Sequence, residues 1–552
     1  MKHLTIYVAL SIPLLFACTT TPSAEKSPTD ITEVPFLTPD ILCGTVQFSD
    51  GYGTEMDSLI SFGLALVHHM TYDDAEHIFD QVIKKDPDCF WGHWGKALTY
   101  IHPLWPDEPS ESQMQRGLIL TQKAMQLASD EREELFGKAL AAYYEDGYSK
   151  SEKERLTSYM EGWNNAKEAR PDDIEARLFH GLTRLANVSP DDKSHEVQLE
   201  VGRLAEAVLE EIKDHPGGFH YAIHAYDLPP LAHHAVRVAR NYGKIAPEIP
   251  HALHMPTHIF TRLGYWQESI DWNYRSARAA EKIPVNGQVS LHYMHALDYM
   301  VYAHLQQGED QTAKTILNGM NALEGPIQPH AASAYALASL PVRYALERKD
   351  WQEAAEIPVR TPSTYPWEKF PAFEAITHFG RGIGAARRGD PDAALESVAA
   401  LKSLQKNMGD SKSTWYWRQQ IEIQKLAVEA WAAFAVGDMK MAEEKMMESV
   451  AIENDLDKSP ITPGEILPAN ELMGDLMMEM KKPQMAINYY EKSLEGTPNR
   501  LNSYYGAMMA ARELKDDETM KKYAAACMEV TSGKKISDRV SAMQAEMKKV
   551  SL

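Results

Sequence analysis

The feature that most constrains the fold is a spacing of small and aromatic residues that occurs near each end of the chain. Gly63 is followed by Ala75, Phe79 and Pro87, at steps of twelve, four and eight residues. A glycine lets a second helix approach closely, and residues four apart lie on one face of that helix. Proline cannot continue a helix interior. The spacing therefore predicts two helices that pack against each other at a small residue.

The same steps recur 411 residues later, at Gly474, Ala486, Tyr490 and Pro498. This pattern is typical of the tetratricopeptide repeat (TPR), in which helical hairpins stack side by side. Five degenerate copies, each a turn residue followed by a small residue, lie between the two: Gly264 with Ser269, Gly308 with Ala313, Asp350 with Ala354, Gly389 with Ala394, and Gly437 with Ala442. No run of alternating β-branched residues bounded by turns follows position 50, so we predict an all-α, TPR-like helical-hairpin solenoid.

Residues 1–17 are predicted to be a lipoprotein signal peptide that precedes this solenoid. Lys2 is followed by an apolar run at residues 4–16, which is too short to span a bilayer permanently. The run ends in the sequence LFAC, which resembles a bacterial lipobox, so Cys18 is the expected lipidation site. An ordinary signal peptide with a chance cysteine is the alternative. We expect a lipid anchor to a bacterial membrane, with the outer membrane favoured, and a globular part outside the cytoplasm.

The rest of the chain is divided by composition. Residues 18–40 are rich in Thr, Pro, Ser and charge, so they are expected to form a lipidated tether and flexible linker. Soft divisions then give N-terminal TPR-like repeats at 41–214, histidine-rich helical repeats at 215–330 and C-terminal TPR-like repeats at 331–552. Stacked repeats share a continuous core, so no true domain boundary is expected.

Charge and cysteine content exclude several kinds of partner and site. The formal net charge is −22, whereas nucleic acids and anionic lipid surfaces need a basic partner. Beyond Cys18, the chain has only Cys43, Cys89 and Cys527, without paired spacing. Disulfides and zinc ribbons are therefore not expected to define the fold.

Histidines are concentrated in one part of the chain. They form three groups together with aspartates: His220, His224 and Asp227; His251, His254 and His258; and His292, His295 and Asp298. Spacings of three and four residues place each group on one helical face. Pro256 fits best in the first turn of a helix, which places His254 at the helix entry and His258 inside its first turn.

Neutral imidazole is the commonest protein ligand for transition metals, so this density of histidines predicts a metal site. The expected ligands are His220, His224, Asp227, His251, His254, His258, His292 and His295. Imidazoles with a few carboxylates suit zinc, iron or copper, and the sequence does not choose between these divalent transition metals. The alternative is that the histidines stack and form hydrogen bonds between helices without a metal.

Four further residues are candidates for contact with a substrate. Tyr221 and Arg262 lie within the histidine-rich groups and could hold one. His102 and Trp105 belong to the sequence HPLW, which leaves a helix and could point at the concave surface of the solenoid. In contrast, most of the Met residues are expected to fill the core between repeats, because Met packs well into irregular gaps.

The chain resembles a bacterial family of exported or membrane-associated TPR lipoproteins with a histidine-rich motif of the HAxHMPTHIF type. The resemblance rests on four segments: HALHMPTHIFTRLGYWQESIDWN, HYAIHAYD, DPDCFWGHWGKAL and ITPGEILPANELMGDL. It implies the solenoid fold and the importance of His251, His254 and His258. The family has no settled activity, so the resemblance implies no reaction.

Three functions are compatible with these patterns. The first is a metal-dependent enzyme or metal-binding protein at the cell envelope, in which an open coordination position would activate water or oxygen and Asp227 or Asp298 would act as base. The alternative is a non-enzymatic TPR scaffold that binds a peptide or protein partner on its concave face. A third is a nutrient-uptake lipoprotein that captures a glycan or peptide on Trp and Tyr side chains.

The lipidation site can be tested directly. Replacing Cys18 by Ser should release the protein from the membrane fraction, because the apolar run alone is too short for a stable span. Cell fractionation and labelling with a fatty acid measure this, and Cys43→Ser serves as the control that keeps both membrane association and label. Retention of the Cys18→Ser protein at the level of the unaltered chain, with no label in either, would contradict the prediction.

Overall fold

Helices form nearly all regular secondary structure in the part of the chain that the structure, a computed structural model, describes. The described residues are 36–48, 51–105, 107–189, 192–409, 412–457, 461–532, 534 and 536–550. Within them, β-structure is limited to two isolated bridges, which pair Val285 with Gln288 and Val289 with Ile327. The predicted signal peptide and Cys18 lie outside the described residues. None of the described helices combines the length and the apolar composition that crossing a bilayer requires.

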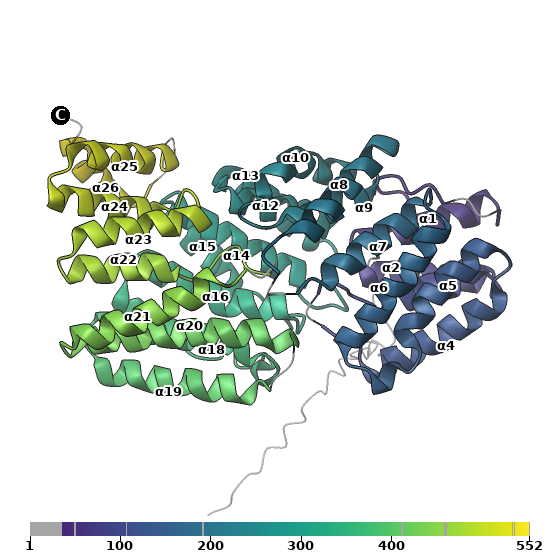
Figure 1. Ribbon diagram of the computed structural model, residues 1–552, viewed down its shortest axis with the longest axis horizontal. Helices are drawn as coiled ribbons and strands as arrows, with labels where there is room; N and C mark the ends of the chain where they lie inside the picture. The colour runs from purple at the N-terminus through teal and green to yellow at the C-terminus, as the bar shows by residue number, and fades with distance from the viewer. Residues whose placement is uncertain are drawn as a thin grey trace, which may run out of the picture. The chain divides into compact units, whose positions relative to one another are not determined.

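Consecutive helices pack against each other along the whole described chain (Figure 1). The first group comprises α1 (Thr54–His68), α2 (Tyr72–Lys85), α3 (Phe90–Leu98), α4 (Glu111–Leu127), α5 (Glu131–Tyr144), η1 (Gly147–Ser149), α6 (Glu152–Ala169), α7 (Ile174–Ala186) and α8 (Glu196–Glu211). The middle group comprises α9 (Pro216–Tyr226), η2 (Ala232–Ala235), α10 (Val236–Ile245), α11 (Pro250–His254), α12 (Pro256–Arg262), α13 (Trp266–Ala280), α14 (Leu291–Gln306) and α15 (Asp310–Asn321).

The remaining helices continue the same pattern toward the C-terminus. They are α16 (Ala331–Glu347), α17 (Trp351–Glu356), η3 (Trp367–Lys369), α18 (Pro371–Arg387), α19 (Pro391–Asn407), α20 (Lys412–Ala435), α21 (Met439–Asn454), α22 (Ala469–Glu479), α23 (Pro483–Gly496), α24 (Leu501–Leu514), α25 (Asp517–Val530) and α26 (Asp538–Val550).

The predicted hairpin packing is present at both ends of the chain. A Cβ atom on Gly63 would lie 2.9 Å from the Phe79 ring, and one on Gly474 would lie 2.7 Å from the Tyr490 ring, so each aromatic ring occupies the space that glycine leaves. Ala75 and Ala486 are fully buried. The small residues of the five degenerate copies are fully buried as well: Ser269, Ala313, Ala354, Ala394 and Ala442. The all-α, TPR-like fold is therefore confirmed.

Local signals explain where the second helix of a hairpin begins. Gly389 and Gly437 adopt positive φ values of 85° and 87°, which glycine tolerates without steric strain. In each case an aspartate follows and caps the next helix: Asp390 accepts from the Ala393 N–H, and Asp438 from that of Met441. A side-chain oxygen at this position satisfies a backbone donor that would otherwise lack a partner.

The apolar core consists of two main clusters. One draws its buried residues from positions 37–260 and the other from positions 294–543. Helices α9, α11 and α12 contribute to the first cluster, and α14 contributes to the second. A third, smaller apolar cluster, formed by Trp266, Ile270, Tyr302 and Ala303, joins α13 to α14. The apolar core of the described residues is therefore divided within the histidine-rich segment.

The C-terminal repeats also contact the middle of the chain. The Trp266 indole donates to the Asn499 carbonyl at 2.8 Å, and the Asn499 amide donates to the Gly264 carbonyl at 3.2 Å. The buried Arg500 guanidinium next to it donates to both carboxylate oxygens of Glu471. Repeats of an ideal solenoid touch only their neighbours, so this long-range contact departs from the simple model.

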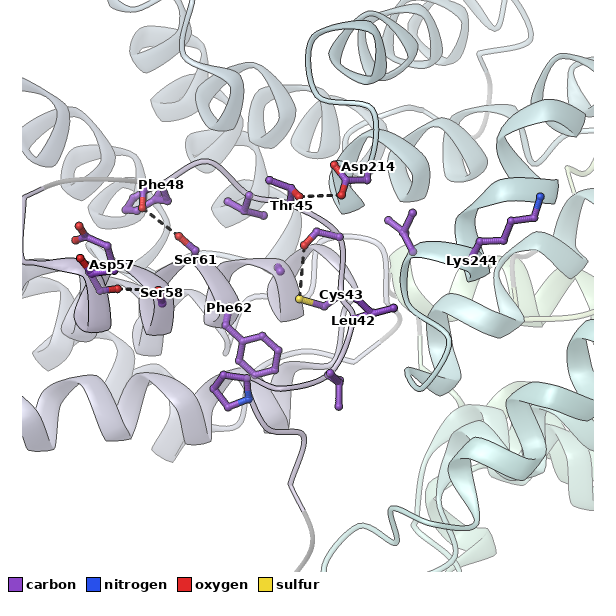
Figure 2. A pocket seen from close by; sticks show the side chains of 17 residues that line it. Leu42, Cys43, Thr45, Phe48, Asp57, Ser58, Ser61, Phe62, Asp214 and Lys244 are labelled. Atoms are coloured by element: carbon purple, nitrogen blue, oxygen red, sulfur yellow. Dashed lines mark hydrogen bonds between the residues drawn. The ribbon is translucent and has the colours of Figure 1, made fainter.

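The segment before α1 is fastened to the helices that follow it. Leu37 is buried, and its N–H donates to Asp74 at 2.9 Å. The Thr45 hydroxyl donates to Asp214 at 2.8 Å, at the side of an open cavity shown in Figure 2. Leu37, at the C-terminal end of the expected linker, is therefore part of the apolar core, whereas residues 18–35 of that linker lie outside the described residues.

The close contact at Gly474 gives a testable prediction. Replacing Gly474 by Leu should destabilise the C-terminal repeats by about 1–3 kcal/mol, because the added side chain must displace the Tyr490 ring. Hydrogen exchange should accelerate across α22–α24. The control is Gly319→Leu in α15, where a Cβ atom meets nothing within 4 Å. Equal exchange in both variants would contradict the packing.

Candidate metal centre

Four helices bring the predicted ligands into one cluster of imidazoles. His220 and His224 lie on α9, His251 and His254 on α11, His258 on α12, and His292 and His295 on α14. Pro250 and Pro256 are the first residues of their helices, as expected for Pro256. The ring centroids of His254 and His295 are 4.3 Å apart, and those of His220 and His251 are 5.0 Å apart. Three segments that are distant in sequence therefore meet, as the metal hypothesis requires.

His254, His258 and His295 form a set that we call the inner triad. Each offers a ring nitrogen within 4.8 Å of those of the other two, and all three residues are buried. His254 Nδ1 donates to Asn273 Oδ1 at 2.7 Å. The Asn273 amide group itself donates to the Ser269 carbonyl, which fixes the orientation of the Asn273 oxygen toward His254.

Asp227 orients the second ring of the inner triad. His258 Nδ1 donates to Asp227 Oδ2 at 3.0 Å, and Arg262 Nε donates to Asp227 Oδ1 at 2.8 Å. The guanidinium keeps the carboxylate ionised, so the carboxylate can only accept from the imidazole. In metal sites, a carboxylate often accepts from whichever ring nitrogen of a histidine ligand does not bind the metal. Asp227, which was predicted to be a ligand, has both carboxylate oxygens bonded to protein groups, His258 and Arg262.

In each ring, the hydrogen bond at Nδ1 determines whether Nε2 carries a proton or a lone pair. His254 Nε2 and His258 Nε2 are 2.9 Å apart. Both Nδ1 atoms donate to acceptor oxygens, so in neutral rings both Nε2 atoms present lone pairs to each other. Only a proton or a cation between them can relieve the repulsion. Burial, with a further contribution from His258, holds the pKa of His254 well below its ordinary value, so His254 stays neutral. A proton shared by the two rings would therefore lie on His258, which is paired with Asp227.

The distance between these two nitrogens is consistent with a shared ion. Imidazole nitrogens bind zinc at about 2.0–2.1 Å, so two of them on one ion lie about 2.9–3.4 Å apart at coordination angles of roughly 90–109°. The separation of 2.9 Å falls at the lower end of this range. Neutral, buried imidazoles that point at one space form a suitable donor set for a divalent transition metal.

His220, His224 and His251 form a second set, the outer triad, whose ring nitrogens also lie within 4.8 Å of one another. His220 Nδ1 donates to the His68 carbonyl at 2.6 Å. Its Nε2 atom is buried and has no hydrogen-bond partner among the described residues, and the same holds for His224 Nε2 and both ring nitrogens of His251.

These four partnerless nitrogens, on neighbouring rings, are available to a ligand. A buried polar atom without a partner costs about 1–3 kcal/mol, so stacked histidines that serve only packing should satisfy their nitrogens with protein groups. In the outer triad, four buried ring nitrogens lack such a group. This arrangement is compatible with ring nitrogens that bind a ligand.

Burial also sets the protonation of the cluster. It lowers the pKa of His251 and His295 well below the ordinary value, with neighbouring histidines adding to the effect. The pKa values of His224 and His292 are lowered to about 3 by the same cause. These imidazoles are therefore neutral at physiological pH, which is the form that coordinates metals.

A cavity of about 230 Å³ reaches the histidine cluster at His292, and its lining includes no residue of the outer triad. Its lining includes His102, Trp105, His292 and His330. The Trp105 ring lies 5.9 Å from that of His251 and 5.4 Å from that of His330. The sequence HPLW therefore leads from its helix to the histidine cluster. A small molecule in this cavity would lie against Trp105 and His292.

The two other residues that were predicted to contact a substrate have different surroundings. Tyr221 is buried, and its hydroxyl bonds to His68 Nδ1 at 2.9 Å. Arg262 is buried and bonds to Asp227. Neither lines the cavity, so both support the positions of other residues. Asp298, proposed as a base, accepts from the Ser339 hydroxyl at 2.7 Å and lies 3.5 Å from Arg343 Nε.

Sequence reasoning missed the group that supports His220 from behind. His68, Glu175 and His215 are buried together, with Glu175 bonded to His68 at 2.7 Å and to His215 at 3.1 Å. The Gly217 N–H donates to His215 Nδ1, so His215 donates from Nε2 to the carboxylate. Because these nitrogens are satisfied by protein groups, the cluster is a hydrogen-bonded support and not a further ligand set. The pair His68–His69 next to a predicted turn was its only sequence signal.

The larger cavity in Figure 2 has no comparable chemistry. It measures about 880 Å³ and is lined by Cys43, Thr45, Phe62, Asp214 and other residues of the N-terminal segment and α1. Burial, together with the nearby Asp214, raises the pKa of the Cys43 thiol to about 11. A thiol of this kind is a poor nucleophile and metal ligand at neutral pH.

The lowered pKa values predict that the metal-free protein loses stability in mild acid. His224 stays neutral in the folded state until about pH 3, whereas in the unfolded chain it takes up a proton near pH 6.5. The free energy of unfolding should therefore fall as pH falls from about 6.5 toward 3, by about 1.4 kcal/mol per pH unit for each such histidine.

Urea denaturation of the metal-free protein between pH 5 and 7 measures this slope. Replacing His224 by Gln should reduce this slope by at most the contribution of one histidine, which is about 1.4 kcal/mol per pH unit. The control is His233→Gln, an exposed histidine on η2. An unchanged slope in His224→Gln would show that this ring titrates normally in the folded protein.

Comparisons with known proteins give little beyond this geometry. No protein-family model matches the chain, and no curated protein matches its sequence. Among solved structures, the APC/C hetero-tetramer Cut9–Hcn1 is 12% identical, with 90% of this chain and 96% of that chain covered and a TM-score of 0.29. Yeast Tom70 is 11% identical (90% and 96% covered, TM-score 0.33), and the P58(IPK) TPR domain is 10% identical (90% and 98%, TM-score 0.21). Such low scores carry no functional argument, so the TPR-like fold rests on the hairpin packing described above.

Proposed function

We propose that the chain binds a divalent transition metal through its histidine cluster and acts as a metal-dependent enzyme or metal-binding protein. The observation that carries this proposal is the 2.9 Å approach of His254 Nε2 to His258 Nε2 while both Nδ1 atoms donate to fixed oxygens. A cation between the two Nε2 atoms would bind both lone pairs and relieve their repulsion. The buried, neutral imidazoles around them supply further donors.

The donor set narrows the choice of metal. The ligands would be His220, His224, His251, His254, His258 and His295, with His292 at the cavity edge. Imidazole nitrogens favour zinc, iron or copper over calcium and magnesium, which prefer oxygen. A bound ion would supply a Lewis acid and lower the pKa of a coordinated water. The protein's own part is to hold the ligands, through Asp227 and Asn273, and to admit a small molecule beside Trp105.

We place this protein at the bacterial cell envelope. The LFAC sequence supports lipidation at Cys18, and the resemblance to exported TPR lipoproteins with the HAxHMPTHIF-type motif supports the same location. The globular part would then face away from the cytoplasm, with the outer membrane favoured.

A non-enzymatic scaffold is the second candidate. Apolar side chains on α19 and α21 are half exposed, among them Leu395, Met441 and Met447, and could contact a peptide or protein partner. In that case the histidines would serve the packing of the solenoid alone. The two candidates differ in their metal content and in the effect of removing histidines.

Metal analysis of the purified full chain tests the proposal. The unaltered protein should contain at least about one equivalent of zinc, iron or copper, and His254→Ala/His258→Ala should lose at least one equivalent with its helical circular dichroism largely retained. Loss of the ligands removes the ion, but most apolar contacts between helices persist.

The matched control is His233→Ala/His234→Ala, a pair of exposed histidines outside the cluster, which should keep its metal. If the protein is instead a non-enzymatic scaffold, the unaltered protein should contain no metal. The melting temperature of His254→Ala/His258→Ala should then fall clearly. That result would end the metal proposal.

A further inference from the structure

We infer that the cluster contains two metal sites, one per triad, and that the ion of the outer triad is the one open to small molecules. This inference rests on the proposed metal function and goes beyond it in stoichiometry and in the division of roles. The first observation is the number of imidazole side chains that could bind a metal. The cluster holds seven imidazoles, whereas a zinc ion in a protein takes about four ligands.

The ring nitrogens of the imidazoles separate into two groups. The ligand atoms of the outer triad lie within 4.8 Å of one another, and so do those of the inner triad. Ring centroids are as close as 4.7 Å in the outer triad (His220 and His224) and 4.3 Å in the inner triad (His254 and His295). The shortest centroid distances between the triads are 6.4 Å. The donors therefore converge on two neighbouring points.

Each triad also has its own support. Asp227 and Asn273 orient the inner triad, and the His68 carbonyl orients His220 of the outer triad. A hydrogen bond at Nδ1 fixes the tautomer so that Nε2 is free to coordinate. Two metal sites would each need rings that hydrogen bonds hold in a fixed orientation. A single shared ion would need only one such set of rings.

The surroundings of the triads differ. His254 of the inner triad packs against Asn273 and Tyr299, both fully buried. In the outer triad, His251 lies next to Trp105 and 5.2 Å from His292, and both of these line the 230 Å³ cavity. An ion held by three histidines with free coordination positions is the usual form of a catalytic zinc site, whereas closed sites are structural.

The geometry therefore assigns different roles to the two ions. The inner ion would remain bound and hold α11, α12 and α14 together. The outer ion would accept a small ligand from the cavity at a free coordination position. The ligand is of a class that coordinates transition metals, such as a small anion, and its size is limited by the cavity.

Cobalt(II) loading of the metal-free full chain tests the assignment, because bound cobalt has visible absorption that reports its ligands. The unaltered protein should bind about two equivalents. The variants His224→Ala/His251→Ala and His254→Ala/His258→Ala should each bind about one, and His233→Ala/His234→Ala should bind two. His224 Nε2 and both ring nitrogens of His251 make no hydrogen bond to the described residues, so replacing these two histidines breaks few protein contacts.

Azide addition tests which ion is open. It should change the cobalt spectrum of the unaltered protein and of His254→Ala/His258→Ala, but not that of His224→Ala/His251→Ala. X-ray absorption of the unaltered protein gives a second measurement that does not depend on the folding of a variant, since it should report a mainly imidazole shell at both equivalents.

The outcomes separate the inference from the proposed function. One equivalent in the unaltered protein, lost in both variants, means one shared ion; this overturns the two-site inference and leaves the metal function intact. No bound metal overturns both. Two equivalents in any other distribution among the variants, or an azide response that persists without the outer triad, overturns the assignment of one ion to each triad.

Discussion

The close approach of helices at small residues is the constraint on which the structure depends. Gly63 and Gly474 leave room for the rings of Phe79 and Tyr490, and a side chain at either glycine would collide with them. Hairpins packed this tightly stack with little space between neighbours. Short helices such as α11 and α12 can then lie beside α9 and α14, close enough for their imidazoles to meet.

Local sequence was sufficient to predict the helical hairpins because their packing depends on spacing within one repeat. The steps from Gly63 to Pro87 specify a turn, a close contact and a helix end. The contact of Asn499 with Gly264 has no such signal, because it joins residues 235 positions apart. The division of the core into two clusters was unpredictable for the same reason: it depends on which repeats touch in space.

Local sequence also predicted part of the candidate site, but not the residues that hold its rings in place. Histidines three and four residues apart showed which rings share a helix face, and Pro256 showed where α12 begins. The sequence could not show that Asn273 and the His68 carbonyl hold two of the rings, since an asparagine on another helix and a backbone oxygen carry no pattern. It also could not show that Arg262 and Asp227 bind each other, a pairing that follows only from the path between α9 and α12.

The hydrogen bond from His220 to the His68 carbonyl joins residues 152 positions apart. Closing such a long loop carries an entropic cost that local contacts do not, so contacts of this kind form late in folding. The ligand set would consequently be complete only after the N-terminal helices have docked onto the histidine-rich ones. An ion bound there would discriminate between the native chain and partly folded forms, and its binding energy would stabilise the native chain alone. Metal binding would then report that the N-terminal helices have docked onto the histidine-rich ones.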